Sequence, residues 1–548
     1  MIKRIFRKTF LNSHVPSSVM SAAGLITIAG LASRILGLFR DRLLASTFGA
    51  GDTLDVYYAA FRIPDLIYNI LILGALSAAF IPVFTSLISN EKEKEAWKLA
   101  GGIMNLAVGL IIIFSIVFCI FSPFLMRIIT PGFSPEKMEK VVLFTRIMFL
   151  SPLFLGISGI FGGILTSYKR FFIYSLAPIF YNVGIIFGIL VFVKIWGPIG
   201  LAWGVVLGAF LHMLTQYPSA YQLGFRNSLS LAKHIKNSEV RKVFRLMIPR
   251  TLGIAVNQVN LFVITIFASF LASGSLAIFN FAQNLQSVPL GIIGVSFAIA
   301  VFPTLSALYS KNEKEKFIVN FSETFRQILF FIIPLSAFIL LLRAQVVRVV
   351  LGAGKFDWED TVLTFQCLGI FSISLFAQSL VPLLARAFYA MHNTKTPFYI
   401  ALASEAVNIL AVILLIDKYH VLSLAIAFSL AATVQMLLLL FILRLKYESL
   451  DDKKIISSVG KIVLATLFSG AVIQGTKYLA VKFVNMDTFL GVFSQLVASA
   501  LFGALVYFII SHLVKLEEYH TFKKSITRRI FKKEKIVLAE DTGEVSGI

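Results

Sequence analysis

Several charged residues stand inside long apolar stretches of this 548-residue sequence. The stretch that begins near Val19 contains Arg34 and runs directly into Arg40 and Asp41. An arginine presents its N–H donors in a planar fork that matches the oxygens of a phosphate. Because a charge in an apolar environment usually faces a polar cavity, these arginines predict a cavity that binds an anionic, pyrophosphate-like group.

The spacing of the charged residues predicts which of them share a helix face. Arg34 and Asp41 lie seven residues apart, close to two helical turns, whereas Arg34 and Arg40 are separated by about 600° of rotation. Arg62 and Asp65 form a second pair at three-residue spacing in the next apolar stretch. We therefore expect Arg34 and Asp41 to point to the same side of one helix.

Other interpretations of these polar residues stay open. Three of the arginines could have a structural role, either in ion pairs that hold helices together or with side chains that extend to a membrane surface: Arg34, Arg62 and Arg250. The second role is expected for Arg146, which lies near the start of its stretch. The amide-rich segments of 257–260 and 280–286 could equally hold helices together.

Membrane-spanning helices are the elements that must position these charges. Of all residues 58% are hydrophobic and only 14% are charged, against about 25% in soluble domains. This composition argues against soluble enzymes, disordered chains and disulfide scaffolds. A span needs about 20 mostly apolar residues. This criterion predicts an all-α polytopic membrane protein of about fourteen spans: 17–39, 56–88, 97–124, 141–167, 171–193, 197–221, 246–271, 276–308, 327–351, 362–388, 398–417, 421–443, 458–480 and 486–514.

The charge distribution predicts how these spans are oriented. The net charge is +22, which in a soluble protein would suggest nucleic-acid binding. With alternating loops, however, 34 of the 50 Lys and Arg residues fall on the side of the N-terminus and 12 on the other side. This bias predicts that both termini are cytoplasmic and that no nucleic acid is bound. The basic start with its long apolar run is expected to be a retained first helix rather than a cleaved signal peptide.

The chain resembles itself at an offset of about 221 to 226 residues. Pro82 aligns with Pro303 and Asn182 with Asn408, in the same order in both halves. Although a chance match of apolar sequence is the alternative, this repeat predicts two six-helix lobes related by an axis along the membrane normal. The predicted parts are a basic N-terminus (1–16), an N-lobe (17–222), a cytoplasmic linker (223–245), a C-lobe (246–444), two extra helices (445–514) and a basic cytoplasmic tail (515–548).

The sequence contains no arrangement typical of an enzyme. There is no GxxxxGK[ST] motif for a nucleotide, and no His/Cys/Ser set with catalytic spacing. Cys119 and Cys367 both lie in apolar runs and are expected to be packing residues, as is His212. We therefore expect a transporter without a cofactor, driven by the membrane potential or an ion gradient.

Several motifs resemble the MurJ/MviN family of lipid II flippases, within the multidrug/oligosaccharidyl-lipid/polysaccharide exporter superfamily. The most specific is Ser33-Arg-Ile-Leu-Gly-Leu-Phe-Arg-Asp41, and the likeness runs from about residue 17 to 445. Further similar segments are Phe48–Gly51, Phe61–Pro64, Gly74–Pro82, Thr265–Ser269, Pro289–Gly294, Gly354–Asp357 and Asn393–Pro397.

The resemblance implies a two-lobe carrier that moves an undecaprenyl-pyrophosphate-linked cell-wall precursor from the inner to the outer leaflet of the bacterial cytoplasmic membrane. In such proteins, arginines and an aspartate of the first span line the central cavity. Together with the residue patterns, this gives a candidate cavity set of Arg34, Arg40, Asp41, Asp55, Arg62, Arg250 and Asn284.

The sequence also departs from the family pattern. Tyr68 and Asn284 stand where relatives carry arginines, and Leu73 stands where relatives carry an acidic residue. Arg250 could supply a compensating cation. Ile264 replaces an acidic residue of the family's sodium site, which leaves Ser404 and Asn408 as weak candidate metal ligands.

Three classes of function stay open. The first is a flippase for lipid II or another lipid-linked oligosaccharide. The second is an ion-coupled exporter of small molecules, for which Glu405 is the supporting carboxylate. The third is a membrane scaffold, which has no need of intramembrane arginines. Expected partners are the lipid-linked glycan, membrane lipids and proteins of cell-wall synthesis, which the basic tail could contact.

Overall fold

The computed structural model describes residues 19–70, 80–226 and 258–531, with side chains from residue 28 to residue 524, and every regular element in these ranges is helical. Ten described segments are long and apolar enough to cross a membrane. They coincide with predicted spans three to six and eight to fourteen, because Phe171–Gln222 contains two of them. The predicted all-α membrane fold is confirmed, whereas the count of fourteen spans is not.

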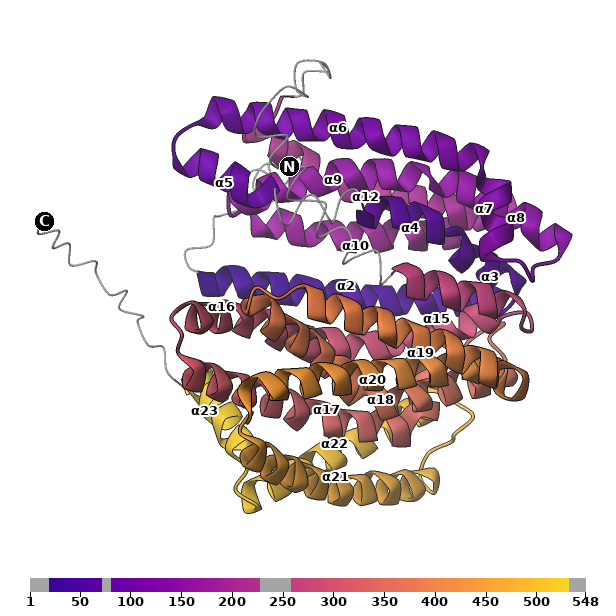
Figure 1. Cartoon of the computed structure of the whole chain (residues 1–548). Coiled ribbons are helices and arrows are strands. Elements are labelled where there is room, and N and C mark those ends of the chain that lie inside the picture. The colour runs from indigo at the N-terminus through magenta and orange to yellow at the C-terminus, as the bar shows by residue number, and fades with distance from the viewer. Residues whose placement is uncertain (1–18, 71–79, 227–257, 532–548) are drawn as a thin grey trace, which may run out of the picture.

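The helices form two groups that stack on either side of α2 (Val19–Phe48), as Figure 1 shows. Helix α2 packs along α10 of the first group and also contacts α15 and α17 of the second. The first group contains α3 (Asp52–Ala60), α4 (Arg62–Tyr68), α5 (Ile81–Ser89), α6 (Glu93–Ile120), α7 (Ser122–Ile129), α8 (Pro135–Met148), α9 (Leu150–Ser167), α10 (Phe171–Phe187), α11 (Val193–Trp196) and α12 (Gly200–Gln222).

The second group begins with the short helix Gln258–Ser269. It continues with α15 (Ser275–Pro289), α16 (Ser296–Ser310), α17 (Lys314–Val350), α18 (Trp358–Ala390), α19 (Lys395–Tyr419) and α20 (Val421–Tyr447). The helices α21 (Asp452–Val481) and α22 (Phe489–Leu513) pack against α17 and are followed by α23 (Glu517–Phe531). The predicted lobe boundary stays a prediction, because 227–257 lies outside the described residues.

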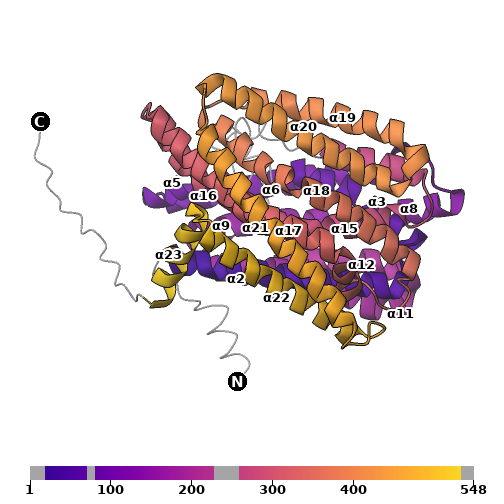
Figure 2. The same cartoon turned by 90° about the horizontal axis from the view of Figure 1, so that it is seen from below.

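The two ends of this bundle are expected to differ in charge. We call the end where α2 begins the basic end, because the sequence predicts most of the Lys and Arg residues on that side; α23 lies at the same end (Figures 1 and 2). We call the end where α2 stops, at Phe48, the opposite end.

Glycines set a close helix contact within the first group. A Cβ added to Gly184 of α10 would lie 2.3 Å from the Cα of Gly208 on α12, and one on Gly188 would lie 2.4 Å from the Cα of Gly204. Small residues let helix backbones approach where lipid gives no hydrophobic driving force for packing. These glycines therefore fix α10 and with it the side chain of Asn182, which faces α2.

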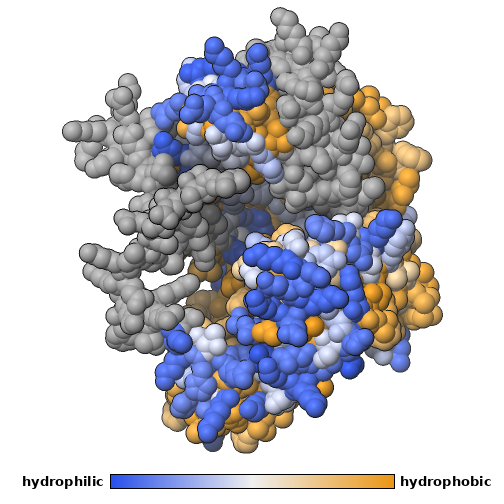
Figure 3. Space-filling view, turned by 60° about the vertical axis from the view of Figure 1, so that its left-hand side comes forward, coloured by the Kyte–Doolittle hydropathy of each residue, from blue (hydrophilic) through white to orange (hydrophobic). Residues whose placement is uncertain are grey.

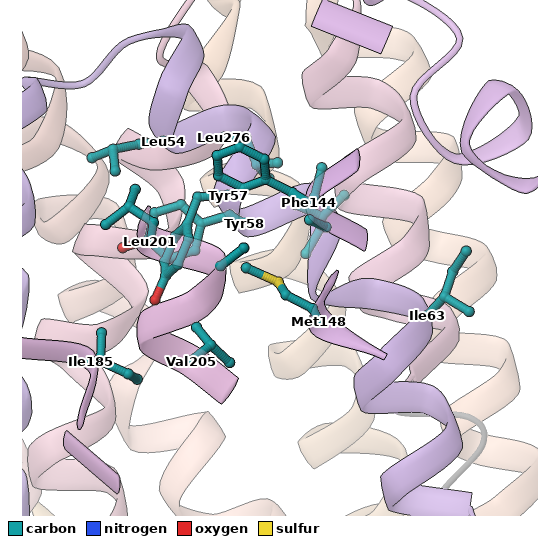
Figure 4. Close-up of a cluster of buried hydrophobic side chains, with 14 of the residues drawn as sticks. Leu54, Tyr57, Tyr58, Ile63, Phe144, Met148, Ile185, Leu201, Val205 and Leu276 are labelled. Carbon is teal, nitrogen blue, oxygen red and sulfur yellow. The ribbon is translucent and has the colours of Figure 1, made fainter. Parts of the chain in front are cut away.

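A buried apolar cluster joins the two groups at the opposite end. Figure 4 shows Leu54, Tyr57 and Tyr58 of α3 close to Phe144 of α8 and Leu276 of α15. All five are almost completely buried. The α3 helix thus packs simultaneously on its own group and on the start of α15, which places the residues around it at the contact between groups.

Candidate functional site

Arg40 and Asp41 of α2 connect both helix groups. Arg40 donates from Nε and Nη2 to Oδ1 of Asp41, at 3.0 and 2.8 Å, and from Nη1 to Oδ1 of Asn182 on α10 at 3.1 Å. The other oxygen of Asp41 accepts a hydrogen bond from Nδ2 of Asn284 on α15 at 2.9 Å. Asp41 is buried at 3% exposure, so its charge is balanced within the protein by Arg40.

Arg34 lies two turns earlier on α2 and faces α15 as well. Its Nη1 donates to the carbonyl oxygens of Ser287 and Val288, at 3.3 and 3.0 Å. A Cβ on Gly291 would lie 2.1 Å from Nη2 of Arg34, so the guanidinium rests directly on backbone at this glycine. Among the described residues no carboxylate pairs with Arg34. Its positive charge therefore remains available to an anion.

The predicted helix face is confirmed, since Arg34 and Asp41 both bond to α15. Arg40 points instead to α10, as its rotation from Arg34 predicted. The three residues consequently form one polar strip across α2 from group to group.

A cluster of charges at the opposite end contains Asp55. Its carboxylate accepts from Nζ of Lys137 at 2.8 Å, and from the backbone N–H groups of Gly274 at 2.8 Å and Ala277 at 3.0 Å. Lys137 also pairs with Asp52 at 2.7 Å. Burial raises the pKa of Asp52, but hydrogen bonds from Lys137 and Ser273 lower it more, so its pKa lies below the usual range.

Asp55 therefore works as a helix cap supplied by another helix. Gly274 precedes α15 with φ = 87° and has no side chain to cap it. Carboxylates are favourable at a helix N-terminus, where N–H groups are unpaired. The predicted cavity set grouped Asp55 with Arg34 and Arg40. The structure places it instead at a contact between the groups, at the start of α15.

Further backbone contacts hold the groups together at this end. The N–H of Ala50 donates to Asp360 at 2.8 Å, and the N–H of Lys355 donates to the carbonyl of Ser46 at 2.9 Å. Gly132 donates to the hydroxyl of Ser269 at 3.0 Å. Each pair joins α2 or the first group to the second group, so the opposite end is closed.

Arg62 also contributes to the contact between groups. Its Nε donates to the hydroxyl of Thr265 at 2.7 Å, while its buried Nη2 has no partner among the described residues. The predicted pair with Asp65 does not form an ion pair in this structure, because the guanidinium is held by Thr265.

The basic end is hollowed between the two groups. Figure 3 looks at this end and shows hydrophilic residues in the depth of the hollow, between the two stacks of helices. A structure closed at one end and hollowed at the other is the arrangement of an alternating-access carrier, in which a polar site between two helix groups opens to one side at a time.

The weak metal candidates have other contacts. Ser404 donates to the carbonyl of Ala431 at 2.8 Å, and Asn408 donates to Glu405 at 3.2 Å. The second oxygen of Glu405 accepts from Asn260 at 2.8 Å. Within the described ranges no group of three or more His, Cys, Asp or Glu residues could hold a metal ion.

Several site residues were missed from the sequence. The sequence could have pointed to Asn182, because it belongs to the internal repeat, and to Asp360, because it follows the Gly354–Asp357 motif closely. Thr265 belongs to the similar segment Thr265–Ser269, whereas nothing in the sequence pointed to Lys137, because its role depends on which helices meet. Arg250 lies outside the described residues, so its predicted role stays a prediction.

Comparisons with known proteins agree with this geometry. Residues 44–494 match the family described as lipid II flippase MurJ. The "probable lipid II flippase MurJ" of Buchnera aphidicola subsp. Acyrthosiphon pisum (strain APS) is 30% identical, over 93% of this chain and 93% of its own. That of Bdellovibrio bacteriovorus is 31% identical, over 92% of this chain and 97% of its own.

Solved structures show the same fold. A structure of lipid II flippase MurJ in an inward closed conformation has a TM-score of 0.74 and 26% identity, and it covers 92% of this chain and 99% of that one. An inward-facing multidrug resistance MATE family transporter of the MOP superfamily has a TM-score of 0.65 at 15% identity, over 76% of this chain and 96% of that one, a likeness of fold alone. With more than half of its length matched by the family and a relative aligned over nearly the whole chain, the protein belongs to the lipid II flippase MurJ family.

Proposed function

We propose that this protein is a flippase that moves lipid II, the lipid-linked peptidoglycan precursor, from the inner to the outer leaflet of the bacterial cytoplasmic membrane. The observation that carries the proposal is Arg34. It lies between two helix groups in a bundle that is closed at the opposite end, and its described hydrogen-bond acceptors are backbone carbonyls alone. A cation left without a carboxylate inside a membrane protein is the group that a pyrophosphate would bind.

Arg34 and Arg40 have different roles in binding. Arg40 is oriented by Asp41 and Asn182 and is already neutralised by the former. Arg34 exchanges two neutral carbonyl acceptors for an anionic phosphate, and hydrogen bonds to ionised acceptors are roughly twice as strong as neutral ones. Binding of the headgroup would therefore weaken the Arg34 contact with α15.

Transport then follows by alternating access. The basic end faces the cytoplasm, as the excess of Lys and Arg indicates, and the headgroup enters from there while the lipid tail stays in the bilayer. Release requires that the contacts of Asp55, Asp360 and Ser269 break and that the groups close at the basic end. The membrane potential or an ion gradient supplies the bias, about 2.3 kcal/mol per unit charge per 100 mV.

Growth of a bacterial host depleted of its own flippase tests this proposal. We expect the wild-type chain to restore growth, and Arg34→Ala and Arg40→Ala to abolish it with normal membrane insertion. Arg127→Ala is the matched control, because Arg127 is an exposed residue of α7. If both cavity variants restore growth as well as the control, the arginines do not bind the substrate.

The second candidate is a flippase for another lipid-linked oligosaccharide, and the same test separates the two. A chain that inserts well but never restores growth would transport a different glycan. An ion-coupled small-molecule exporter is favoured only by Glu405, a buried carboxylate that bonds to the amides of Asn260 and Asn408. Export of a cationic dye that is lost in Glu405→Gln and kept in Arg34→Ala would support the exporter.

A further inference from the structure

A cavity lies among helices of the first helix group. It has a volume of about 300 Å³, at the lower end of the range for small-ligand sites. Helices α4, α9, α10 and α12 surround it, with the lining residues Asp65, Tyr68, Asn69, Leu155, Pro178, Tyr181 and His212. None of these residues belongs to the strip of Arg34, Arg40 and Asp41.

Asp65 is the charged residue of this cavity. Arg62, one helical turn away, attracts it electrostatically, but the Nε of Arg62 is bonded to Thr265 and the two side chains form no ion pair. Across the described part of the chain, no Lys, Arg or His nitrogen forms an ion pair with Asp65, and no hydrogen bond to its carboxylate is found. His212 is engaged through Nδ1 with the hydroxyl of Ser158 at 2.7 Å. An uncompensated buried charge is unfavourable, so a carboxylate that faces a cavity without an ion-pair partner can bind a cation there.

The remaining lining indicates what kind of cation fits. Two tyrosines, Tyr68 and Tyr181, line the cavity together with Asp65, while Leu155 and Pro178 add apolar surface. Aromatic rings attract ammonium groups through their faces, and a carboxylate adds charge and hydrogen bonding. A bare metal ion would need several oxygen or nitrogen ligands at short distance. Carboxylate, rings and apolar surface together favour an organic ammonium group.

The cavity adjoins the arginine strip through α10. Tyr181 lines the cavity, and the next residue, Asn182, accepts the hydrogen bond from Arg40. An anion-binding strip and an anionic pocket therefore lie next to each other on one helix. This arrangement suits a ligand that carries a phosphate and, at another point, a positive charge.

We propose that the Asp65 cavity is a subsite for an ammonium group carried by the transported headgroup. The source of the ammonium rests on the proposed function, whereas its recognition by Asp65, Tyr68 and Tyr181 does not. Arg34 would hold the phosphate end, and Asp65 would select headgroups that bear a free amine.

The first experiment measures recognition alone, with the purified full chain in detergent. We expect butylammonium chloride to raise the unfolding temperature more than sodium chloride at equal concentration. Asp65→Asn should raise the half-effective concentration about tenfold, since a hydrogen bond to a charged group is lost. Asp417→Asn, which removes an exposed carboxylate of α19, is the matched control and should respond like the wild type.

Two results would overturn the site: an equal response of Asp65→Asn and the wild type, or no response beyond that to sodium chloride. If Asp65→Asn does not fold, Leu155→Trp replaces it, because the larger ring fills the cavity and leaves the carboxylate in place. That variant should also lose the response to butylammonium, and an unchanged response would again contradict the proposal.

The second experiment tests the source of the ammonium. The wild type should bind lipid II more tightly than lipid II whose free amines are acetylated, and Asp65→Asn should bind both equally. Equal binding of the two lipids by the wild type overturns the headgroup as the source. Failure of the proposed function has a different signature, because a chain that binds neither lipid and restores no growth would still respond to butylammonium.

Discussion

At the residue scale, the two oxygens of Asp41 have separate partners. One oxygen neutralises Arg40 and the other binds Asn284 across the contact between helix groups. Of Arg34 and Arg40, Arg34 alone therefore keeps a positive charge without a carboxylate partner among the described residues. The seven-residue spacing in the sequence was enough to predict the shared face of Arg34 and Asp41. It could not reveal Asn182 and Asn284 as the partners, because partner choice depends on how α10 and α15 pack.

Asn284 should tolerate a positive charge and reject a negative one. In Asn284→Arg the guanidinium can replace the amide as donor to Asp41, so we expect growth in the depleted host to be retained. In Asn284→Asp two carboxylates would face each other, with a repulsion of about 4 kcal/mol at 4 Å and an effective dielectric constant of 20. We expect that variant to lose activity and to unfold at lower temperature. The reverse order of the two variants would show that Asn284 does not act through Asp41.

Lys137 should stabilise the closed opposite end. Lys137→Met removes both ion pairs and leaves the buried carboxylate of Asp55 with its two backbone donors, at a cost of about 2–3 kcal/mol. Thermal unfolding in detergent measures this loss. Lys94→Met, which removes an exposed lysine of α6, is the control. An unchanged unfolding temperature in Lys137→Met would mean that the ion pairs contribute nothing to closure.

At the element scale, the spans were predictable because the bilayer demands a minimum apolar length and internally satisfied backbone. The predicted spans from 97 to 221 and from 276 to 514 coincide with described helices. The second stretch starts as two short helices, α3 and α4, that meet at Phe61. A kink in this long stretch was predictable, because Pro64 has no N–H for the carbonyl of Ala60. The packing of α3 against α8 and α15 was not predictable from the local sequence.

The glycine contact between α10 and α12 should be intolerant of any side chain. Gly184→Ala would place a Cβ 2.3 Å from the Cα of Gly208, so the helices must separate at a cost of at least about 1–3 kcal/mol. Gly30→Ala in α2 is the matched control, since a Cβ there meets nothing within 4 Å. We expect low membrane yield and a lower unfolding temperature for the first variant alone. Equal behaviour of the two would contradict the close contact.

At the scale of the whole molecule, the contacts between groups concentrate at the opposite end, whereas the basic end is hollowed. The sequence predicted two lobes and a central charged site, but it did not indicate which end is closed. Closure depends on hydrogen bonds between residues far apart in the chain, such as Asp55 with Gly274, which are 219 positions apart. Those contacts belong to one conformation of the carrier. The sequence must be compatible with every conformation of the transport cycle, so it does not indicate which one the structure shows.

A cross-link across the opposite end should stop transport. Asp52→Cys with Ser273→Cys joins side chains whose oxygens are 2.7 Å apart, in a chain from which Cys119 and Cys367 have been removed. We expect oxidation to abolish growth in the depleted host and reduction to restore it. Thr85→Cys with Ser167→Cys, whose hydroxyls are 3.0 Å apart within the first group, is the matched pair and should have no effect. Full activity of the oxidised first pair would exclude opening at this end.

The cap that Asp55 of α3 supplies to α15 has one more consequence. Helix α15 has no capping side chain of its own, and its first N–H groups are bonded to Asp55 only while the two groups touch. Separation would leave the amide protons of Gly274 and Ala277 without acceptors and open to exchange with solvent. Deuterium uptake at these two positions would thus report, without any label or mutation, the fraction of molecules that face each side of the membrane.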